Sequence, residues 1–428
     1  MARLARGSSP RGLPWHSHPV RGVGGPEAGV GRRVDGEAVG EARHPAVPAA
    51  VSPRALQDQQ RVALAAGDHR HKVRLKQGFL ELRYSGRAMT EESYDPAELI
   101  EAYFEREWTD GLPVVPPTEK SIAEMLGGAA LRGDEVIGEI PERGVVVSAE
   151  KLAINAVMAG CRPEYLPVVV AAVCGLCHCD FAYHGPASST GGSAMVLIVN
   201  GPIAHRLGIN SGNNVFGQGV RANATIGRAV RLTMMNVMNT RPGFLDRATL
   251  GNPGKYSFCF AENEAQHPWE PLHVERGHRA EQSAVTVFAS NSLCQVYNQL
   301  AAEPEPLLRC FADALCNLGT PNLRGFNQSL VVVAGEHADI LRQSGWSKLD
   351  VRRFLVEHAR RTVADLKRAG RRPGAVEPGD EITWKHAFER PEDILIVCAG
   401  GQAGSWSACL PGWGNKWTRS VTTLIDTP

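Results

Sequence analysis

Three uninterrupted apolar runs stand out along the chain. They are Ala194–Asn200 (AMVLIVN), Ser329–Ala334 (SLVVVA) and Asp393–Ala399 (DILIVCA), and turn-forming residues follow the first and the third. Short apolar runs that do not alternate with polar residues are typical of strands buried on both faces. We therefore expect three buried strands in this part of the chain.

Apolar residues at helical spacing surround these runs. The expected helices are Pro96–Trp108, Ser121–Leu126, Lys151–Met158, Pro163–Cys179, Ala222–Val237, Glu336–Gln343 and Lys348–Ala364. Gly144–Val147 resembles a further strand, and Gly160 stands where a helix C-cap glycine is expected. Strands interleaved with helices predict an α/β fold with a mixed or mostly parallel sheet and flanking helices.

The first 88 residues differ from the rest. They hold 15 Lys and Arg against 7 Asp and Glu, a net charge of +8, and their apolar residues show no sustained period. Such a stretch buries too little surface to offset its chain entropy, so we expect residues 1–88 to be disordered. Met89 opens an acidic segment that turns at once helical. This favours an extension translated upstream of the true start; a basic tail and an Arg-rich transit peptide are the alternatives.

Residues 89–428 are expected to form one α/β region, with 89–290 and 291–428 as candidate subdomains. The whole chain carries 46 Lys and Arg against 45 Asp and Glu, and 43% of it is hydrophobic. This suits a soluble globular protein and provides no basic block for nucleic acid. No apolar run approaches the length of a membrane span, and no secretory signal is recognisable, so we expect a cytoplasmic protein. Neither a cofactor nor an oligomeric state follows from composition, although a homo-oligomer is a common state.

An Asn- and Gly-rich segment, Gly208–Gly219 (GINSGNNVFGQG), precedes the expected helix Ala222–Val237. Backbone N–H groups at a helix N-terminus bind anions, so the segment is a candidate substrate or anion site. The candidate residues are Asn210, Ser211, Asn213, Asn214, Gly217, Gly219 and Arg221. The alternative is a structural turn, because asparagine tolerates positive φ. A dinucleotide-binding glycine motif matches poorly, since no strand ends directly before it.

Acidic and histidine side chains are most concentrated in Cys259–Glu275, which we call the acid–histidine segment. Its carboxylates and imidazoles could supply a general acid/base pair or metal ligands, and the candidate catalytic residues are Glu262, Glu264, His267 and His273. The candidate metal ligands are His267, His273 and Glu264, although the spacing matches no zinc signature. A solvated acidic loop around a buried Trp269 is the alternative.

The sequence favours a packing role for the clustered cysteines and for three of the tryptophans. Cys174-Gly-Leu-Cys177-His178-Cys179 is the tightest cysteine cluster, and its apolar surroundings favour packing over a redox pair or half a metal site. For Trp406, Trp413 and Trp417, core packing beside Pro411-Gly412 is favoured, with a partner-contact surface as the alternative.

Four stretches carry a family resemblance: TDGLPVVPPT, KLAINAVMAGCRPEYLPVVVAAV, GINSGNNVFGQGVRANATIGRAVRL and KYSFCFAENEAQHPWEPLHVERG. Together they resemble a bacterial family of unassigned reaction that is associated with UGSC family (seleno)proteins. Those proteins are similar to selenoprotein B of glycine, sarcosine and betaine reductases. The resemblance covers nearly all of Glu98–Pro428 and implies a thiol- or selenol-carrying partner. The chain has no Cys-Gly-Ser-Cys motif, and Cys174-Gly-Leu-Cys177 shares only its spacing.

Taken together, the residues favour an enzyme, or a substrate-binding enzyme subunit, acting on a small anionic metabolite. Sites in α/β proteins lie at strand carboxyl ends, where the asparagine loop and the acid–histidine segment would meet. Thiol- or selenol-linked redox chemistry with a UGSC-type partner is the first expectation. A metal-dependent hydrolase or lyase is the runner-up, and a non-catalytic partner protein is the third alternative.

Overall fold

The computed structural model describes residues 96–428 except 326, 415 and 428. The chain divides between Ala88 and Met89 into two units, and every described residue belongs to the second. The disorder expected for residues 1–88 therefore lies outside the described residues. Within them, helices and mixed sheets alternate along the chain, so the α/β class is confirmed.

Two four-stranded sheets form the centre of the described unit. In order, the first sheet contains β12 (Val421–Leu424), β5 (Ala284–Ser290), β3 (Ala194–Asn200) and β4 (Cys259–Ala261). The second contains β10 (Ile394–Cys398), β7 (Ser329–Val333), β11 (Trp406–Pro411) and β6 (Cys294–Tyr297). The three predicted strands are present as β3, β7 and β10. Only β3–β4 and β7–β10 pair in parallel, so both sheets are mixed rather than mostly parallel.

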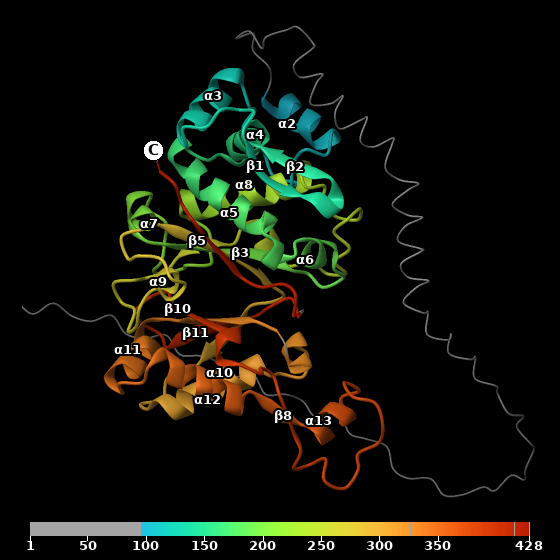
Figure 1. The fold of residues 1–428 in the computed structure, drawn as a ribbon, viewed down its shortest axis with the longest axis vertical. Helices are drawn as coiled ribbons and strands as arrows, with labels where there is room; N and C mark the ends of the chain where they lie inside the picture. The colour runs from blue at the N-terminus through green and yellow to red at the C-terminus, as the bar shows by residue number, and fades with distance from the viewer. Residues whose placement is uncertain (1–95, 326, 415, 428) are drawn as a thin grey trace, which may run out of the picture. The chain divides into compact units, whose positions relative to one another are not determined.

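The two sheets pack face to face, with helices on their outer faces (Figure 1). Alternate residues of β3 show why its sequence is apolar throughout. Ala194, Val196 and Ile198 pack between the sheets, while Met195, Leu197 and Val199 face the helical layer. A strand covered on both sides has no solvent-facing position for a polar residue. Two sheets were not foreseen, because an apolar run does not say which sheet it joins.

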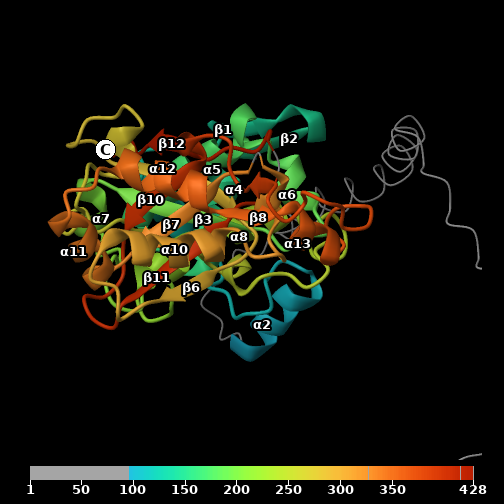
Figure 2. The same cartoon turned by 90° about the horizontal axis from the view of Figure 1, so that it is seen from below.

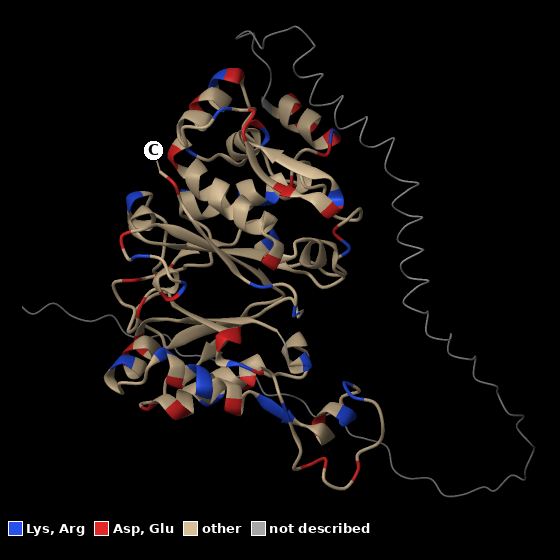
Figure 3. Cartoon of the chain, in the orientation of Figure 1, with Lys and Arg blue, Asp and Glu red and all other residues tan. Residues whose placement is uncertain are grey.

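Helices cover each sheet on the side away from the other sheet. The first sheet is covered by α5 (Leu166–Cys177) and α8 (Arg221–Asn236), with α4 (Ala149–Ala159) packed on both. The second is covered by α10 (Pro304–Leu315), α11 (Gly335–Gln343) and α12 (Lys348–His358) (Figure 2). Charged residues lie on these helices and on the loops, whereas the central sheets are almost free of them (Figure 3).

Shorter elements complete the unit. They are α2 (Pro96–Glu105), α3 (Glu119–Gly127), α6 (His184–Ser188), α7 (Pro202–Arg206), α9 (Leu272–Glu275), α13 (Val363–Arg368), the hairpin of β1 (Val136–Ile140) and β2 (Val145–Ser148), and the pair β8 (Arg360–Thr362) and β9 (Trp384–His386). Single 3-10 turns occur at Pro141–Arg143, Pro163–Tyr165, Cys179–Phe181, Pro253–Lys255, Pro321–Arg324 and Pro391–Asp393.

Local sequence signals fixed several helix ends. The Ser148 hydroxyl accepts a hydrogen bond from the Lys151 N–H at the start of α4, and Gly160 ends that helix with φ of 87°. Other ends differ from expectation. The stretch from Pro163 begins as a 3-10 turn before α5, and the helix from Lys348 stops at His358, where the chain turns into strand β8.

The order of elements repeats along the chain, and we call Leu166–Tyr297 the first repeat and Pro304–Leu424 the second. Each contains a helix, a strand, two helices and three strands: α5-β3-α7-α8-β4-β5-β6 and α10-β7-α11-α12-β10-β11-β12, with α6, α9 and the β8-α13-β9 segment as additions. The third strand of each group is exchanged. β6 pairs with β11 of the second repeat, and β12 pairs with β5 of the first. Each sheet is therefore completed by a strand from the other repeat.

The tryptophans correct one sequence interpretation. Trp406 is 49% exposed and Trp417 is 67% exposed, so core packing is wrong for both; Trp413 is partly buried against the core. Trp406 begins β11 beside the sheet-edge strand β6, where its ring lies 4.8 Å from that of Tyr297, which is also exposed.

No helix of the described residues is long and apolar enough to cross a membrane.

Candidate functional site

The carboxyl ends of both parallel strand pairs meet at one place. The Asn263 N–H, just after β4, donates to the Cys398 carbonyl at the end of β10 at 2.7 Å. The Gly400 N–H, just after β10, donates to the Ser211 carbonyl of the asparagine loop at 2.8 Å. The short helices α7 and α9 lie at this same end with α11 (Figure 1). The structure thus brings the asparagine loop, the acid–histidine segment and the second sheet together.

Glu262 is the most enclosed acid of this region. It follows β4 directly, is 4% exposed, and its Oε2 accepts hydrogen bonds from Asn200 Nδ2 at 2.5 Å and from the Leu272 N–H at 2.8 Å. Burial alone would raise its pKa, but His267, Lys348 and the Leu272 N–H lower the pKa below its ordinary value. Glu262 is therefore held as a buried carboxylate.

His267 contacts the other oxygen of that carboxylate. Its Nε2 lies 2.8 Å from Glu262 Oε1, and neither side chain has exposed surface. The contact lacks the alignment of a hydrogen bond, and both atoms are buried without another partner. On the far side of the ring, Nδ1 lies 2.8 Å from the Trp269 carbonyl and 3.1 Å from the Trp269 N–H. Which of these groups Nδ1 bonds depends on the tautomer.

Glu264 and His273 form a second pair. Glu264 Oε1 accepts from the Gly201 N–H at 2.6 Å and from Asn200 Nδ2 at 3.0 Å. His273 Nδ1 lies 3.8 Å from the same oxygen. The Asn200 amide therefore bridges the two carboxylates, in the order His267, Glu262, Asn200, Glu264, His273. We call these five residues the His–Glu cluster, and all four candidate catalytic residues belong to it.

A cavity of about 250 Å³ lies beside the cluster. It is lined by Ala265, Gln266, His267, Gly335, Ala338, Asp339, Arg342 and Gln402. The first three come from the acid–histidine segment, the next four from α11, and Gln402 from the loop after β10. The His267 side chain has no exposed surface, so this residue reaches the cavity through its main chain. The Arg342 guanidinium pairs with Asp339 and donates to the Gln266 carbonyl.

The asparagine loop uses much of its polarity internally. Asn210 Oδ1 accepts from the Gly212 N–H, and Asn214, at φ 56°, donates through Nδ2 to the Gln218 carbonyl. Asn213, Asn214, Gly217 and Gly219 are exposed, and Asn213 lies against Gly401, where an added Cβ would meet its Oδ1 at 1.9 Å. The loop therefore reaches the rim of the site through Ser211 and Asn213, while Asn210 and Asn214 hold its turns.

The two arginines near this loop have structural partners. Arg221 donates through Nε and Nη2 to the Gly160 carbonyl, at 3.1 and 2.8 Å, and so closes the end of α4. Arg228 donates two hydrogen bonds to the Asp110 carboxylate, from Nε at 2.8 Å and from Nη2 at 2.7 Å. These hydrogen bonds do not direct either guanidinium toward the loop. The positive charge that was expected to bind an anion at the loop therefore interacts with other groups.

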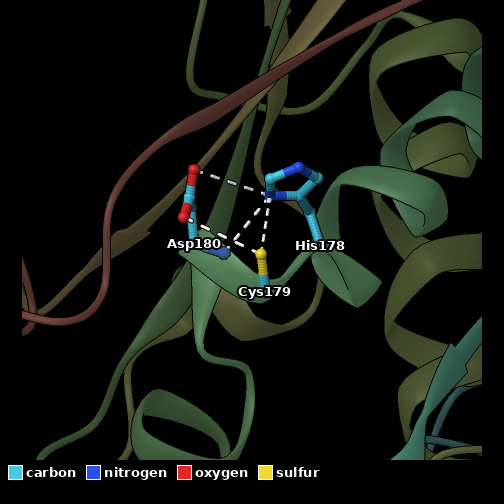
Figure 4. A group of neighbouring side chains, drawn as sticks. All are labelled: His178, Cys179 and Asp180. Carbon is cyan, nitrogen blue, oxygen red and sulfur yellow. Dashed lines mark hydrogen bonds and ion pairs between the residues drawn. The ribbon is translucent and has the colours of Figure 1, made fainter.

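The cysteine cluster agrees with packing for its first two members. Burial raises the pKa of Cys174 and raises that of Cys177 to about 12, which disfavours reactive thiolates. His178, Cys179 and Asp180 are exposed on a 3-10 turn, with their ligand atoms within 4.8 Å of one another (Figure 4). Among the described residues, this is the one trio of His, Cys, Asp or Glu with ligand atoms so closely grouped. The three are neighbours in sequence, and the His178 ring already accepts the Asp180 N–H at 3.2 Å.

Sequence reasoning missed three participants. Asn200 ends the first apolar run, and a polar residue at a buried strand end was a usable signal. Arg342 and Gly335 lie on α11, 60 or more residues beyond the acid–histidine segment, and no local pattern links the helix to that segment. Searches of family models and of curated proteins find no match to this chain.

Proposed function

We propose that the protein is an enzyme, or the substrate-binding subunit of one, that takes a small anionic metabolite into the cavity beside the His–Glu cluster. The observation that carries this proposal is the meeting of a polar, buried cluster and a cavity at the joined carboxyl ends of two parallel strand pairs. Polar groups converging on a concave site at strand ends are the usual setting of α/β active sites.

The cavity lining supports the choice of ligand. Arg342 supplies a cation with several donors, and the α11 N-terminus at Gly335 adds the positive end of a helix dipole. Asp339 pairs with Arg342 but is 46% exposed, so it can turn to solvent when an anion arrives. A volume of about 250 Å³ lies below the usual range for drug-sized ligands, which favours a metabolite of few atoms.

The thiol- or selenol-linked chemistry that the family resemblance implies would place its reactive group on another protein. Cys398 ends β10 near the site, but burial raises its pKa to about 12 and the Glu262 charge adds to this. Such a thiol is a poor nucleophile at neutral pH. A UGSC-type partner, as the family resemblance implies, would then bring the reactive group to a substrate held here.

A second candidate function, a non-catalytic partner protein, is favoured by one observation. Trp406 and Tyr297 form an exposed aromatic pair at the strand edge of the second sheet. Exposed aromatic residues are common anchors of protein interfaces. Under this alternative, Trp406→Ala would abolish complex formation with a companion protein while Arg342→Gln would not change any binding.

Ligand binding tests the main proposal. Phosphate, acetate, pyruvate, malonate and succinate are titrated by calorimetry into the full chain and into Arg342→Gln. We expect saturable binding of at least one anion, weakened tenfold or more in Arg342→Gln. Arg353→Gln, on the exposed face of α12, is the matched control and should bind like the unmodified protein. Absence of binding, or equal binding by Arg342→Gln, would reject the proposed cavity.

A further inference from the structure

Five buried polar atoms of the His–Glu cluster lack a hydrogen-bond partner. They are Asn200 Oδ1, Glu262 Oε1, His267 Nε2, His273 Nδ1 and His273 Nε2. His273 is fully buried, so neither ring nitrogen can be satisfied by bulk solvent. Buried polar groups in folded proteins are nearly always bonded, and a concentration of orphaned atoms indicates an additional ligand.

A second buried histidine shows what the fold does when a ring is purely structural. His337 of α11 is also fully buried, but its Nδ1 lies 2.7 Å from Ser407 Oγ and its Nε2 lies 3.0 Å from the Asn298 carbonyl. Both of its nitrogens are satisfied. The isolation of His273 is therefore not a general property of buried rings in this protein.

The contacts of His267 indicate which kind of ligand the His–Glu cluster would bind. In the tautomer in which Nδ1 donates to the Trp269 carbonyl, Nε2 carries a lone pair, whereas in the tautomer in which Nδ1 accepts the Trp269 N–H, Nε2 carries the proton. Nε2 faces the Glu262 carboxylate oxygen at 2.8 Å without hydrogen-bond alignment, so a proton on Nε2 is poorly placed to bridge the two atoms. In the first tautomer two electron-rich atoms lie this close, and a cation bound between them would remove their repulsion. A histidine that donates its other N–H to a backbone carbonyl is also the usual arrangement for a metal-bound imidazole.

We infer that the His–Glu cluster binds one divalent transition-metal cation through the carboxylates of Glu262 and Glu264 and the imidazoles of His267 and His273. Two carboxylates balance a charge of +2, and mixed nitrogen and oxygen ligands suit zinc, iron, manganese or nickel. The inference rests on the proposed function for the ion's role at the cavity. Because the side chains of Glu262, His267 and His273 have no exposed surface, such an ion could polarise a substrate carboxylate or an attacking water only from the partly exposed Glu264 side of the cluster.

The present side-chain positions form two pairs rather than one closed set. Glu262 and His267 are 2.8 Å apart, and Glu264 and His273 are 3.8 Å apart, with the Asn200 amide between the pairs. Glu264 is the member that can adjust, because its side chain is 29% exposed whereas those of Glu262, His267 and His273 have no exposed surface. No three ligand atoms of the cluster lie within 4.8 Å of one another, so binding requires the two pairs to move together as Glu264 rotates away from Asn200.

Metal binding is tested without any substrate. The full chain, untagged and freed of metal by EDTA and dialysis, is titrated with ZnCl₂ and with MnCl₂ by calorimetry. We expect about one equivalent to bind, with at least a tenfold loss of affinity in Glu264→Gln. Asp180→Asn, which alters the exposed His178–Cys179–Asp180 turn, is the matched control and should bind normally. Circular dichroism confirms that both variants are folded.

X-ray absorption of the zinc-loaded protein provides a second readout that needs no variant. We expect nitrogen and oxygen neighbours at about 2.0–2.1 Å with an imidazole signature and no sulfur at about 2.3 Å. A sulfur neighbour would place the ion on a cysteine and overturn the inference. Binding of less than a tenth of an equivalent, or unchanged affinity in Glu264→Gln, would overturn it as well. Anion binding at Arg342 is measured separately, so failure of one proposal does not imply failure of the other.

Discussion

The two repeats place very different residues at equivalent strand ends. In the first, Asn200 follows Val199 of β3 and Glu262 follows Ala261 of β4, and the Glu262 N–H donates to the Val199 carbonyl at 3.0 Å. In the second, Ala334 and Ala399 hold these positions, and the Ala399 N–H donates to the Val333 carbonyl at 3.1 Å. The same backbone framework thus ends in polar side chains in the first repeat and in alanine side chains in the second.

This difference indicates a division of labour. The first repeat supplies the groups that can do chemistry, while Gly335 and Ala338 of the second leave room for a cavity. The acid–histidine segment of the first repeat contacts the second repeat. Trp269 Nε1 donates to the Trp346 carbonyl at 2.7 Å, and Lys348 Nζ donates to Glu275 at 2.7 Å. Together with the exchanged strands, these contacts hold the polar strand ends of the first repeat against the part of the second repeat that lines the cavity.

The largest expected effect comes from removing the buried acid. Glu262→Leu leaves Asn200, His267 and the Leu272 N–H without their carboxylate, which should cost about 3–5 kcal/mol of unfolding free energy. The equivalent change in the second repeat, Ala399→Gly, removes one buried methyl and should cost about 1 kcal/mol. Urea unfolding of both variants checks this, and equal losses would contradict the claimed asymmetry.

The glycines after β3 and β7 should be alike in both repeats. An added Cβ would lie 2.2 Å from the Gln282 carbonyl oxygen at Gly201, which has φ of 84°, and 2.5 Å from the Gly401 carbonyl oxygen at Gly335. Gly201→Ala and Gly335→Ala should therefore each cost about 2–4 kcal/mol. The control is Gly127→Ala, where nothing lies within 4 Å and the effect should stay within about 1 kcal/mol. Thermal unfolding that finds either variant unaffected would remove that glycine from the shared framework.

A smaller effect is expected from the ion pairs that join the repeats. Glu275 of α9 contacts Lys348 at 2.7 Å and Arg352 at 2.5 Å, both on α12, and its side chain is only 20% exposed. Glu275→Gln should cost about 1–3 kcal/mol because it weakens hydrogen bonds to charged groups. Glu281→Gln changes an exposed glutamate paired with Arg279 and should not alter the denaturant midpoint. If the two variants behave alike, the α9–α12 contact does not hold the repeats together.

The smallest effect is a dependence on pH. Burial alone would raise the pKa of Glu275, but Lys348 and Arg352 lower it below the ordinary 4.5. A carboxyl whose pKa is lower in the folded state stabilises fully above its unfolded pKa, and this contribution is lost as the pH falls through the folded pKa. Stability should therefore decline below about pH 4.5, and less steeply in Glu275→Gln. Urea titrations between pH 7 and pH 3 measure both slopes, and parallel slopes would argue against a lowered pKa.

Local patterns predicted much of the fold. The apolar runs identified β3, β7 and β10, and Gly160 marked the end of α4, because these signals act within a few residues. The strands β5 and β11 pair across long stretches of chain, so neither the second sheet nor the exchange of β6 and β12 could be deduced from periodicity. A mostly parallel sheet was not ruled out in advance for the same reason.

The candidate site was predictable in its chemistry but not in its geometry. Residue types singled out Glu262, Glu264, His267 and His273, and these four lie together. The bridge through Asn200 depends on contacts between distant parts of the first repeat, and the cavity beside Arg342 depends on contacts between the two repeats. Arg221 was chosen for its charge next to the glycines, and its bonds to the Gly160 carbonyl reflect packing that sequence does not reveal.

The most direct test of the division of labour is to locate a bound anion. Crystals of the full chain soaked in selenate and measured at the selenium edge would show the anion as an anomalous peak. The account predicts a peak in the cavity, within contact of Arg342 and beside the acid–histidine segment. A peak at the exposed glycines of the asparagine loop, or no peak in the cavity at an anion concentration that saturates binding in solution, would contradict it.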